Sequence, residues 1–573
     1  MAGWFQPVSN LALQLLRWVR RTPHITAACM FLTAVLVWML YQRDYHEGFR
    51  HYGTDALSLV EQDRENVSLA RLNLLAYTYY LLPYFRVWVL AGGLVFHIAI
   101  LRAVPDVKRA LRPVWAASIC IAIFAVLSDL TDHVEYLEVS ITGEPVTMAT
   151  YVLKLVMIVI ACLVPACALT YYSRVGTLDR YTLRNFLQPL GFCLVAFGSL
   201  WVLMDLLDNY KDLTETASTG EILVFYLQLL PYIYVSIVPA AVLLAVLYTL
   251  TKMSRSNEIV AMLTAGRSVR QVLRPIFVMA AFSALLAMAA NYYWAPRAEG
   301  NRQAIMRAMT EGEEGTVMAE KLMFRNETTR RIWYAGSFPF NLRKEKLRNV
   351  EVRQEDENGQ IMRSWVARSA MWWPGANMWS FYYGIESTYV DGRQQGKNPF
   401  TGVNGYPYRC DVSGWEETPW SIVSSSLTPD FMGVEEIVSY LKTHRELPAE
   451  KLAAFRTHLW QRFAYPWQTF VLALVAAPLG LSFSRRGVLG GVAGSIFIFF
   501  GMMFVNDVFL NLGKGGHLPP WLTVWIPVIG PGLLGLLLLH YRSQNKDLPS
   551  LASLLPKRKS TVRRPRNRAV AAS

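Results

Sequence analysis

The chain has 573 residues, of which 53% are hydrophobic and 17% are charged, and its formal net charge is +14. The charged residues are concentrated between long apolar runs, a pattern that excludes a soluble globular protein and indicates an integral membrane protein. A basic tail, Lys557–Arg568, follows the last apolar run. Beside a membrane helix such a tail is interpreted as an anchor on anionic lipid, and we expect no nucleic-acid partner.

The first 175 residues contain four apolar runs that predict membrane helices, at about 25–41, 74–101, 113–127 and 148–172. Lys and Arg dominate alternate loops, whereas Asp and Glu dominate the others. Because short basic loops stay in the cytoplasm, the N-terminus is expected to be cytoplasmic. Two cations, Arg86 and Lys154, fall inside the second and fourth runs, and the sequence suggests no partner for either.

Six further runs predict membrane helices, at about 186–207, 222–250, 276–294, 459–483, 488–510 and 521–540. A helix needs about 20 apolar residues to cross a bilayer, and these runs are close to that length. The sequence therefore predicts an α-helical polytopic membrane protein with about ten transmembrane helices and both termini in the cytoplasm. The polar segment 295–458 is expected to lie outside.

The loop 251–275 joins two of these runs and carries five Lys or Arg residues against one acid, Glu258. Apolar residues recur in it at the spacing of a short amphipathic helix, which Ser256 or Asn257 can cap and Gly266 can end. Two interpretations stand. The loop is a helix at the inner membrane surface that docks a cytoplasmic partner, or it is a solvated connector whose charge only marks the cytoplasmic side.

The polar segment is too long to be a structureless loop in a compact protein. It contains β-rich runs separated by turn signals, at 331–338, 349–354, 363–373 and 378–386. These runs predict an all-β domain of short antiparallel strands. Its aromatic side chains either line an apolar interior or fill a core. The candidates for such a lining are Trp333, Trp365, Trp379 and Phe381.

Few residues suggest chemistry. The chain has no phosphate-binding GxxxxGK(S/T) motif, and its six cysteines form no disulfide or metal-ligand pattern. We therefore expect neither an enzyme nor a bound cofactor or metal. Asp205, Asp208 and Lys211 crowd the outer end of one predicted helix, and Asn506 and Asp507 lie toward the outer end of another. These residues either mark helix ends or line a cavity.

Three stretches resemble one known family: SRSNEIVAMLTAGRSVRQVLRP at 254–275, LDRYTLRNFLQPL at 178–190 and LTPDFMGVEEIVSYLKTHRE at 427–446. Together they resemble the LptF/LptG family, the permeases of the lipopolysaccharide export ABC transporter, over about 177–545. Members of that family normally lack the four N-terminal helices, so the resemblance gives the N-terminal extension no role.

The resemblance implies a division of the chain into segments. These are a four-helix extension at 1–175, permease helices at 176–296 and 459–545, a coupling helix at about 254–268, a periplasmic β-jellyroll at 297–430, a connector at 431–458 and a basic cytoplasmic tail at 546–573. It also implies that Glu258, with Arg255, Met262 and Gly266, contacts a separate ATPase. In the family the outer end of the first permease helix carries cations for lipid phosphates, whereas here acids dominate.

The partners that the resemblance implies are a cytoplasmic ABC ATPase similar to LptB, a second permease subunit (another copy or a paralogue), periplasmic bridge proteins similar to LptC and LptA, and lipopolysaccharide or a similar glycolipid. The implied function is export of lipid from the outer leaflet of the bacterial inner membrane into the β domain. Two alternatives remain open at this point. One is a membrane-anchored sensor or assembly scaffold, and the other is an exporter of a different amphiphile.

Overall fold

The computed structural model describes residues 92–544, apart from 94, 103, 105, 139–146, 211–218, 312–316, 327, 340–345, 374–375, 377, 391–392, 401–407, 425–427, 446 and 482–487. The first predicted membrane helix, most of the second, Arg86, Lys211 and the basic tail lie outside the described residues.

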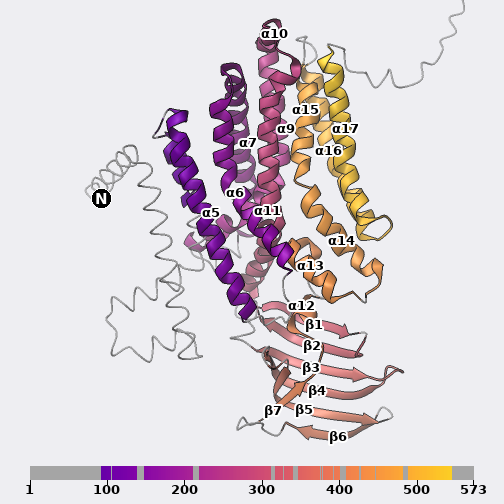
Figure 1. Ribbon diagram of the computed structural model, residues 1–573. Coiled ribbons are helices and arrows are strands. Elements are labelled where there is room, and N and C mark those ends of the chain that lie inside the picture. Colours follow the sequence, from indigo (N-terminus) through magenta and orange to yellow (C-terminus); the bar gives the residue numbers. More distant parts are fainter. Residues whose placement is uncertain are drawn as a thin grey trace, which may run out of the picture.

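Long helices run side by side as a bundle, with the short helix α10 (Glu258–Thr264) at one end and a β sheet at the other (Figure 1). The long helices are α5 (Val107–Glu138), α6 (Met148–Arg174), α7 (Thr177–Asp208), α9 (Thr219–Arg255), α11 (Val269–Glu311), α14 (Ala449–Ala464), α15 (Trp467–Gly480), α16 (Val488–Lys514) and α17 (Pro520–Ser543). Within the described ranges, six helices are long and apolar enough to cross a membrane, or seven if α14 and α15 form one span. A polytopic α-helical membrane protein is confirmed, and the total of ten spans stays a prediction.

Three helices, α9, α11 and α15, form the centre of the bundle. Their apolar residues lie on all sides, as expected for helices surrounded by protein and lipid. Leu247 and Leu250 of α9 pack with Ile276 of α11 and Ala473 of α15 in one buried cluster. The core of the membrane part is therefore centred on these three helices, and residues of α7, α16 and α17 complete it.

Helices α7 and α16 carry long apolar faces that the described part of the chain leaves uncovered. Only 6% of the apolar window of α7 is buried, compared with 67% for α9. The large exposed residues are Phe192, Val195, Leu203 and Leu207 on α7, and Phe497, Phe500 and Phe504 on α16. In a membrane such faces contact either lipid tails or a second protein chain.

The return from the sheet to the membrane is more helical than the sequence suggested. The 3₁₀ turn η3 (Pro429–Phe431) and α13 (Val434–Thr443) precede α14, which begins at Ala449 rather than near 459. Helices α14 and α15 meet at a bend of 53°. Pro466 stands at the break, where it removes one backbone donor and ends the first helix.

The β domain is one antiparallel sheet of seven strands among the described residues, with β1 to β6 in sequence order. The strands are β1 (Val317–Asn326), β2 (Arg331–Pro339), β3 (Leu347–Glu355), β4 (Ile361–Trp373), β5 (Met378–Val390), β6 (Arg393–Pro399) and β7 (Arg409–Ser413). Strands β6 and β7 pair with different halves of β5. The predicted all-β domain is present, and its jellyroll arrangement stays a prediction.

One face of this sheet carries an aromatic core. The ring centroids of Trp333 and Trp379 lie 4.9 Å apart, and Trp415 packs against Trp333, Trp365 and Phe381. Burying these rings removes several hundred Å² of apolar surface from water, which is the main stabilising term for so small a sheet. The four aromatic residues selected from the sequence therefore fill a core together with Trp415.

Candidate functional site

Helix α10 is a short, well-bounded helix at the end of the bundle opposite the sheet (Figure 1). It starts at Asn257, whose φ is 57°, a left-handed conformation that asparagine tolerates. The Asn257 side chain makes no capping hydrogen bond, and the Ser256 hydroxyl donates back to Lys252. The predicted start is thus correct in position, but the backbone turn rather than a side-chain cap defines it.

The end of α10 has the geometry of a Schellman motif. The Gly266 amide donates to the Leu263 carbonyl, and the Arg267 amide donates to the Met262 carbonyl. Gly266 has φ of +85°, where a side chain would be strained. The predicted role of Gly266 in ending the helix therefore has a specific conformational cause.

The two faces of α10 differ. Ile259 and Met262 are buried in the core of the bundle, whereas Val260 is exposed on the other face. Met262 therefore holds the helix onto the bundle, and the structure does not present it to a partner. Arg255 is exposed. Glu258 is half-buried, and its Oε2 has no hydrogen-bond partner among the described residues.

An ion pair between Arg267 and Asp179 fixes the loop that carries α10 to the first turn of α7. Asp179 was not selected from the sequence. It lies in the stretch 178–190, and a carboxylate in the first turn of a helix is itself favoured by the helix dipole. The pair brings together in space two stretches, 178–190 and 254–275, that are far apart along the chain.

Of the predicted acids at the outer end of α7, Asp205 is bound by side chains of two other helices. Arg302 of α11 places Nη1 2.9 Å from Asp205 Oδ1, and its Nη2 lies 2.9 Å from Glu299 Oε1. The Tyr226 hydroxyl donates to Asp205 Oδ2 at 3.1 Å. Asp205 is therefore buried and paired, whereas Asp208 is exposed. Arg302 was missed by the sequence analysis because it follows the predicted end of its helix.

Asn506 and Asp507 of α16 have separate environments. Asn506 Oδ1 accepts a hydrogen bond of 2.8 Å from the Gln468 side chain of α15, so it joins two helices. Asp507 is exposed and lies on the same face of α16 as Phe500 and Phe504. An acid on an apolar membrane face is costly in lipid and indicates contact with protein or water.

The N-terminal extension is joined to the family-like region by a buried polar cluster. Lys154 Nζ of α6 lies 2.8 Å from Asp129 Oδ1 of α5 and 3.8 Å from Glu435 Oε2 of α13. The same ammonium group lies 3.9 Å from the centre of the Tyr293 ring. Burial raises the pKa of Glu435 above its ordinary value, and the charge of Lys154 opposes that shift. The sequence did not predict this cluster.

Further contacts surround this cluster and fix α6 in place. The Tyr292 hydroxyl donates to the Thr150 carbonyl at 2.7 Å, and Lys442 Nζ donates to the Thr147 hydroxyl at 2.9 Å. Helix α6 is therefore held against both α11 and α13. The described part of the extension, α5 and α6, therefore packs against the permease-like region.

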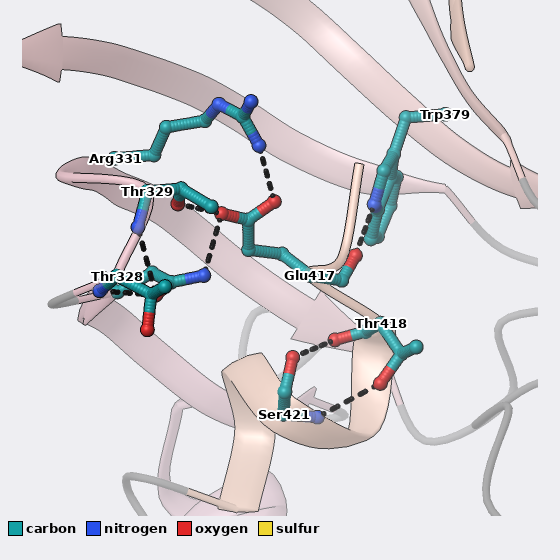
Figure 2. A network of polar contacts seen from close by, with 8 residues as sticks. Thr328, Thr329, Arg331, Trp379, Glu417, Thr418 and Ser421 are labelled. Atoms are coloured by element: carbon teal, nitrogen blue, oxygen red, sulfur yellow. Dashed lines mark hydrogen bonds and ion pairs between the residues drawn. The ribbon is translucent and has the colours of Figure 1, made fainter. Parts of the chain in front are cut away.

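A second buried network closes the aromatic face of the sheet. Glu417 accepts hydrogen bonds from Arg331 at 2.8 Å, from Asn326 at 2.9 Å and from Thr329, and its own carbonyl accepts one of 2.7 Å from Trp379 Nε1 (Figure 2). The Thr418 hydroxyl then accepts from the Ser421 amide and caps α12 (Pro419–Ser424). These bonds hold the segment 415–424 over the tryptophan core.

Among the described residues, no three His, Cys, Asp or Glu side chains lie together in a way that could hold a metal ion. The short helix α10 and the β sheet lie at opposite ends of the long helices (Figure 1). A comparison with curated proteins finds no match. A family model, described as the lipopolysaccharide export system permease LptF/LptG, matches residues 180–541, which is more than half of the chain. The chain therefore belongs to the LptF/LptG family of lipopolysaccharide export permeases.

Proposed function

We propose that the chain is the permease subunit of an ABC-type lipopolysaccharide exporter in a bacterial inner membrane. A separate cytoplasmic ATPase drives it, and the lipid passes from the outer leaflet to the β domain on the periplasmic side. Membership of the family supports a transport permease rather than an enzyme. The arrangement of α10, the membrane helices and the sheet supports the finer steps, which are argued below.

The observation that carries the proposal is the continuity of α11. This helix begins at Val269, just after α10, and ends at Glu311, just before β1. At 1.5 Å per residue it is about 65 Å long, which is more than the thickness of a bilayer. A displacement of α10 by an ATPase is therefore passed through a short turn to one helix that extends toward the sheet.

The exposed side of α10 is the surface that we assign to the ATPase. Glu258 is half-buried, its Oε2 is buried without a hydrogen-bond donor among the described residues, and Val260 is exposed further along the helix. A basic groove on the partner would complement the charge of Glu258 and cover the apolar side chain of Val260. Arg255 and Gly266 lie on the same exposed end.

Two other partners have surfaces on this chain. The apolar faces of α7 and α16 fit a second permease subunit, with Asp507 turned toward the cavity between the subunits. Strand β6 is an edge strand with exposed side chains, and edge strands accept a further strand from another chain. We assign this edge to the periplasmic bridge proteins. The substrate is lipopolysaccharide or a similar glycolipid.

The test is co-purification from a gentle detergent or nanodiscs, with wild type and Glu258→Arg compared by mass spectrometry of bound proteins. We expect wild type to retain an ABC ATPase and Glu258→Arg to lose it. Glu357→Arg is the matched control, because Glu357 is an exposed acid on the sheet. Absence of any ATPase from the wild-type preparation would contradict the proposal and favour a membrane-anchored scaffold.

A further inference from the structure

The outer face of the sheet, opposite the tryptophan core, contains a shallow pocket of about 630 Å³ that crosses β3, β4 and β5. Its walls combine aromatic, charged and amide side chains, among them Asn349, Glu351, Val366, Arg368, Tyr383 and Tyr408. None of these residues belongs to the coupling, cavity or core sets described above. The pocket is therefore a separate feature of the β domain.

The pocket lies on a crease in the sheet. The pairings Val350–Ala367 and Ala367–Gly384 flank the crease on one side, and Arg348–Ser369 and Ser369–Tyr382 flank it on the other. One row of residues lies between these pairings, namely Asn349, Arg368 and Tyr383, and the Tyr383 amide extends the row by donating to the Tyr408 carbonyl at 2.8 Å.

Three members of this row have a left-handed backbone. The φ angles are 51° for Asn349, 52° for Tyr383 and 62° for Tyr408. Bulky residues rarely adopt this conformation, and positions where they do so often serve a function. The crease changes the alternation of the strands, because the buried residues Leu347 and Val350 are three positions apart rather than two. It thereby keeps the tryptophan core continuous while it turns both tyrosines outward.

The two tyrosine rings form an exposed platform. They are stacked, with centroids 5.7 Å apart and ring planes 27° apart, and their side chains are 60% and 57% exposed. Buried tyrosines gain from packing, whereas an exposed, rigidly paired set of rings offers its faces to a ligand. Arg368 is exposed beside the platform, and it forms no ion pair with any residue in the described ranges.

The chemistry around the platform is suited to a saccharide. A sugar presents C–H groups on its flat faces and hydroxyl groups at its rim. The tyrosine rings match the faces, and the guanidinium of Arg368, the amide of Asn349 and the carboxylate of Glu351 supply donors and acceptors for the rim. Glu351 already pairs with Arg353 at 2.6 Å, but a purely apolar ligand would leave Arg368 and the amide of Asn349 without partners, and a bare anion would leave the rings unused.

We propose that this pocket binds the saccharide part of the exported glycolipid, through stacking on Tyr383 and Tyr408 and hydrogen bonds to Arg368. This inference rests on the proposed function, because that function supplies a glycolipid to the β domain. In this proposal the tryptophan face of the sheet forms the apolar core of the domain. The opposite face binds the water-soluble part of the lipid.

The experiment uses the full-length protein in nanodiscs and isothermal titration calorimetry, with three soluble probes. The probes are the oligosaccharide released from a bacterial lipopolysaccharide by removal of its lipid, maltoheptaose as an unrelated sugar, and inorganic phosphate. We expect the released oligosaccharide to bind. The double variant Tyr383→Asn/Tyr408→Asn, which keeps residues that tolerate left-handed φ, should weaken its binding by about tenfold or more.

Met362→Asn is the control, because Met362 is exposed on β4 outside the pocket lining. It should leave oligosaccharide binding unchanged. Equal binding to wild type and the double variant, or binding of phosphate alone, would overturn the proposal. Binding of intact lipopolysaccharide to wild type is measured in parallel. If intact lipid binds and the oligosaccharide does not, the pocket assignment fails while the export function stands. If neither binds, the proposed function fails as well.

Discussion

Lys154 of α6 and Glu435 of α13 face each other across the boundary between the N-terminal extension and the permease region, with Nζ 3.8 Å from Oε2. Asp129 lies on the other side of the lysine at 2.8 Å. The lysine side chain is only 8% exposed, so its charge depends on these two acids. The extension is thus attached at the level of α13, next to the β domain.

Replacing this lysine should loosen the attachment. Lys154→Met leaves Asp129 and Glu435 as buried acids without a cation, and removal of one partner from a buried ion pair costs about 3–5 kcal/mol. We expect a lower midpoint of thermal unfolding in detergent. Lys397→Met, on the exposed edge strand β6, should behave as wild type. Equal midpoints for the two variants would show that the cluster contributes nothing.

The raised pKa of Glu435 predicts a pH dependence. Burial penalises its charged form, so its folded-state pKa exceeds the unfolded value of about 4.3. The stability that this group contributes is complete below about pH 4.3 and is lost as pH rises through the raised pKa. Unfolding measured against pH should therefore favour Glu435→Gln over wild type increasingly as pH rises from about 4 to 7. Glu357→Gln, at an exposed site, should show no such trend, and a trend of opposite sign would mean that Lys154 dominates.

Gly266 provides a conformational test of α10. Its φ of +85° is unfavourable for a β-branched residue, and Gly266→Val should destabilise the end of the helix by about 1–2 kcal/mol. Gly266→Asn, which tolerates this region, should retain most of the wild-type behaviour. Hydrogen exchange of residues 258–268 reports the local effect, and ATPase co-purification reports its consequence. Similar exchange in both variants would exclude a conformational role.

Glu417 tests how firmly the segment 415–424 covers the tryptophan core. Glu417→Ala removes the acceptor for Arg331, whose side chain is largely buried, and should cost about 3 kcal/mol or more. We expect faster hydrogen exchange across 415–424 than in wild type. Glu416→Ala, next to it but exposed, is the control. Unchanged exchange in Glu417→Ala would show that Trp415 packing alone holds the segment.

The sequence predicted those parts of the fold that depend on local signals. The four β-rich runs coincide with β2, β3, β4 and β5, because alternation and turn residues are properties of neighbouring positions. The amphipathic loop became α10 for the same reason. Long apolar runs located the membrane helices, although α14 starts earlier than predicted because its first turns are amphipathic rather than apolar.

Contacts between distant positions could not be predicted. Nothing near Lys154 in the sequence suggests Glu435, and Arg302 lies beyond the apolar run that defined its helix. Met262 was assigned to a partner surface because the stretch 254–275 resembles the family's coupling segment, but a resemblance along the chain does not say which side of the helix packs inward. The crease through Asn349 and Tyr383 depends on three strands in register, which no single strand encodes.

Two connections join the sheet to the membrane part, and they differ in the number of breaks that they contain. One is α11, a single helix with Pro275 and Pro296 inside it, and the other consists of η3, α13 and α14, which ends in the 53° bend at Pro466. When the bundle changes shape, we expect the change to be taken up mainly at the breaks between η3, α13, α14 and α15. The sheet would then move relative to α11. Lys154 of the extension contacts Glu435 of α13, which belongs to this segmented connection. The extension is therefore placed to limit that movement.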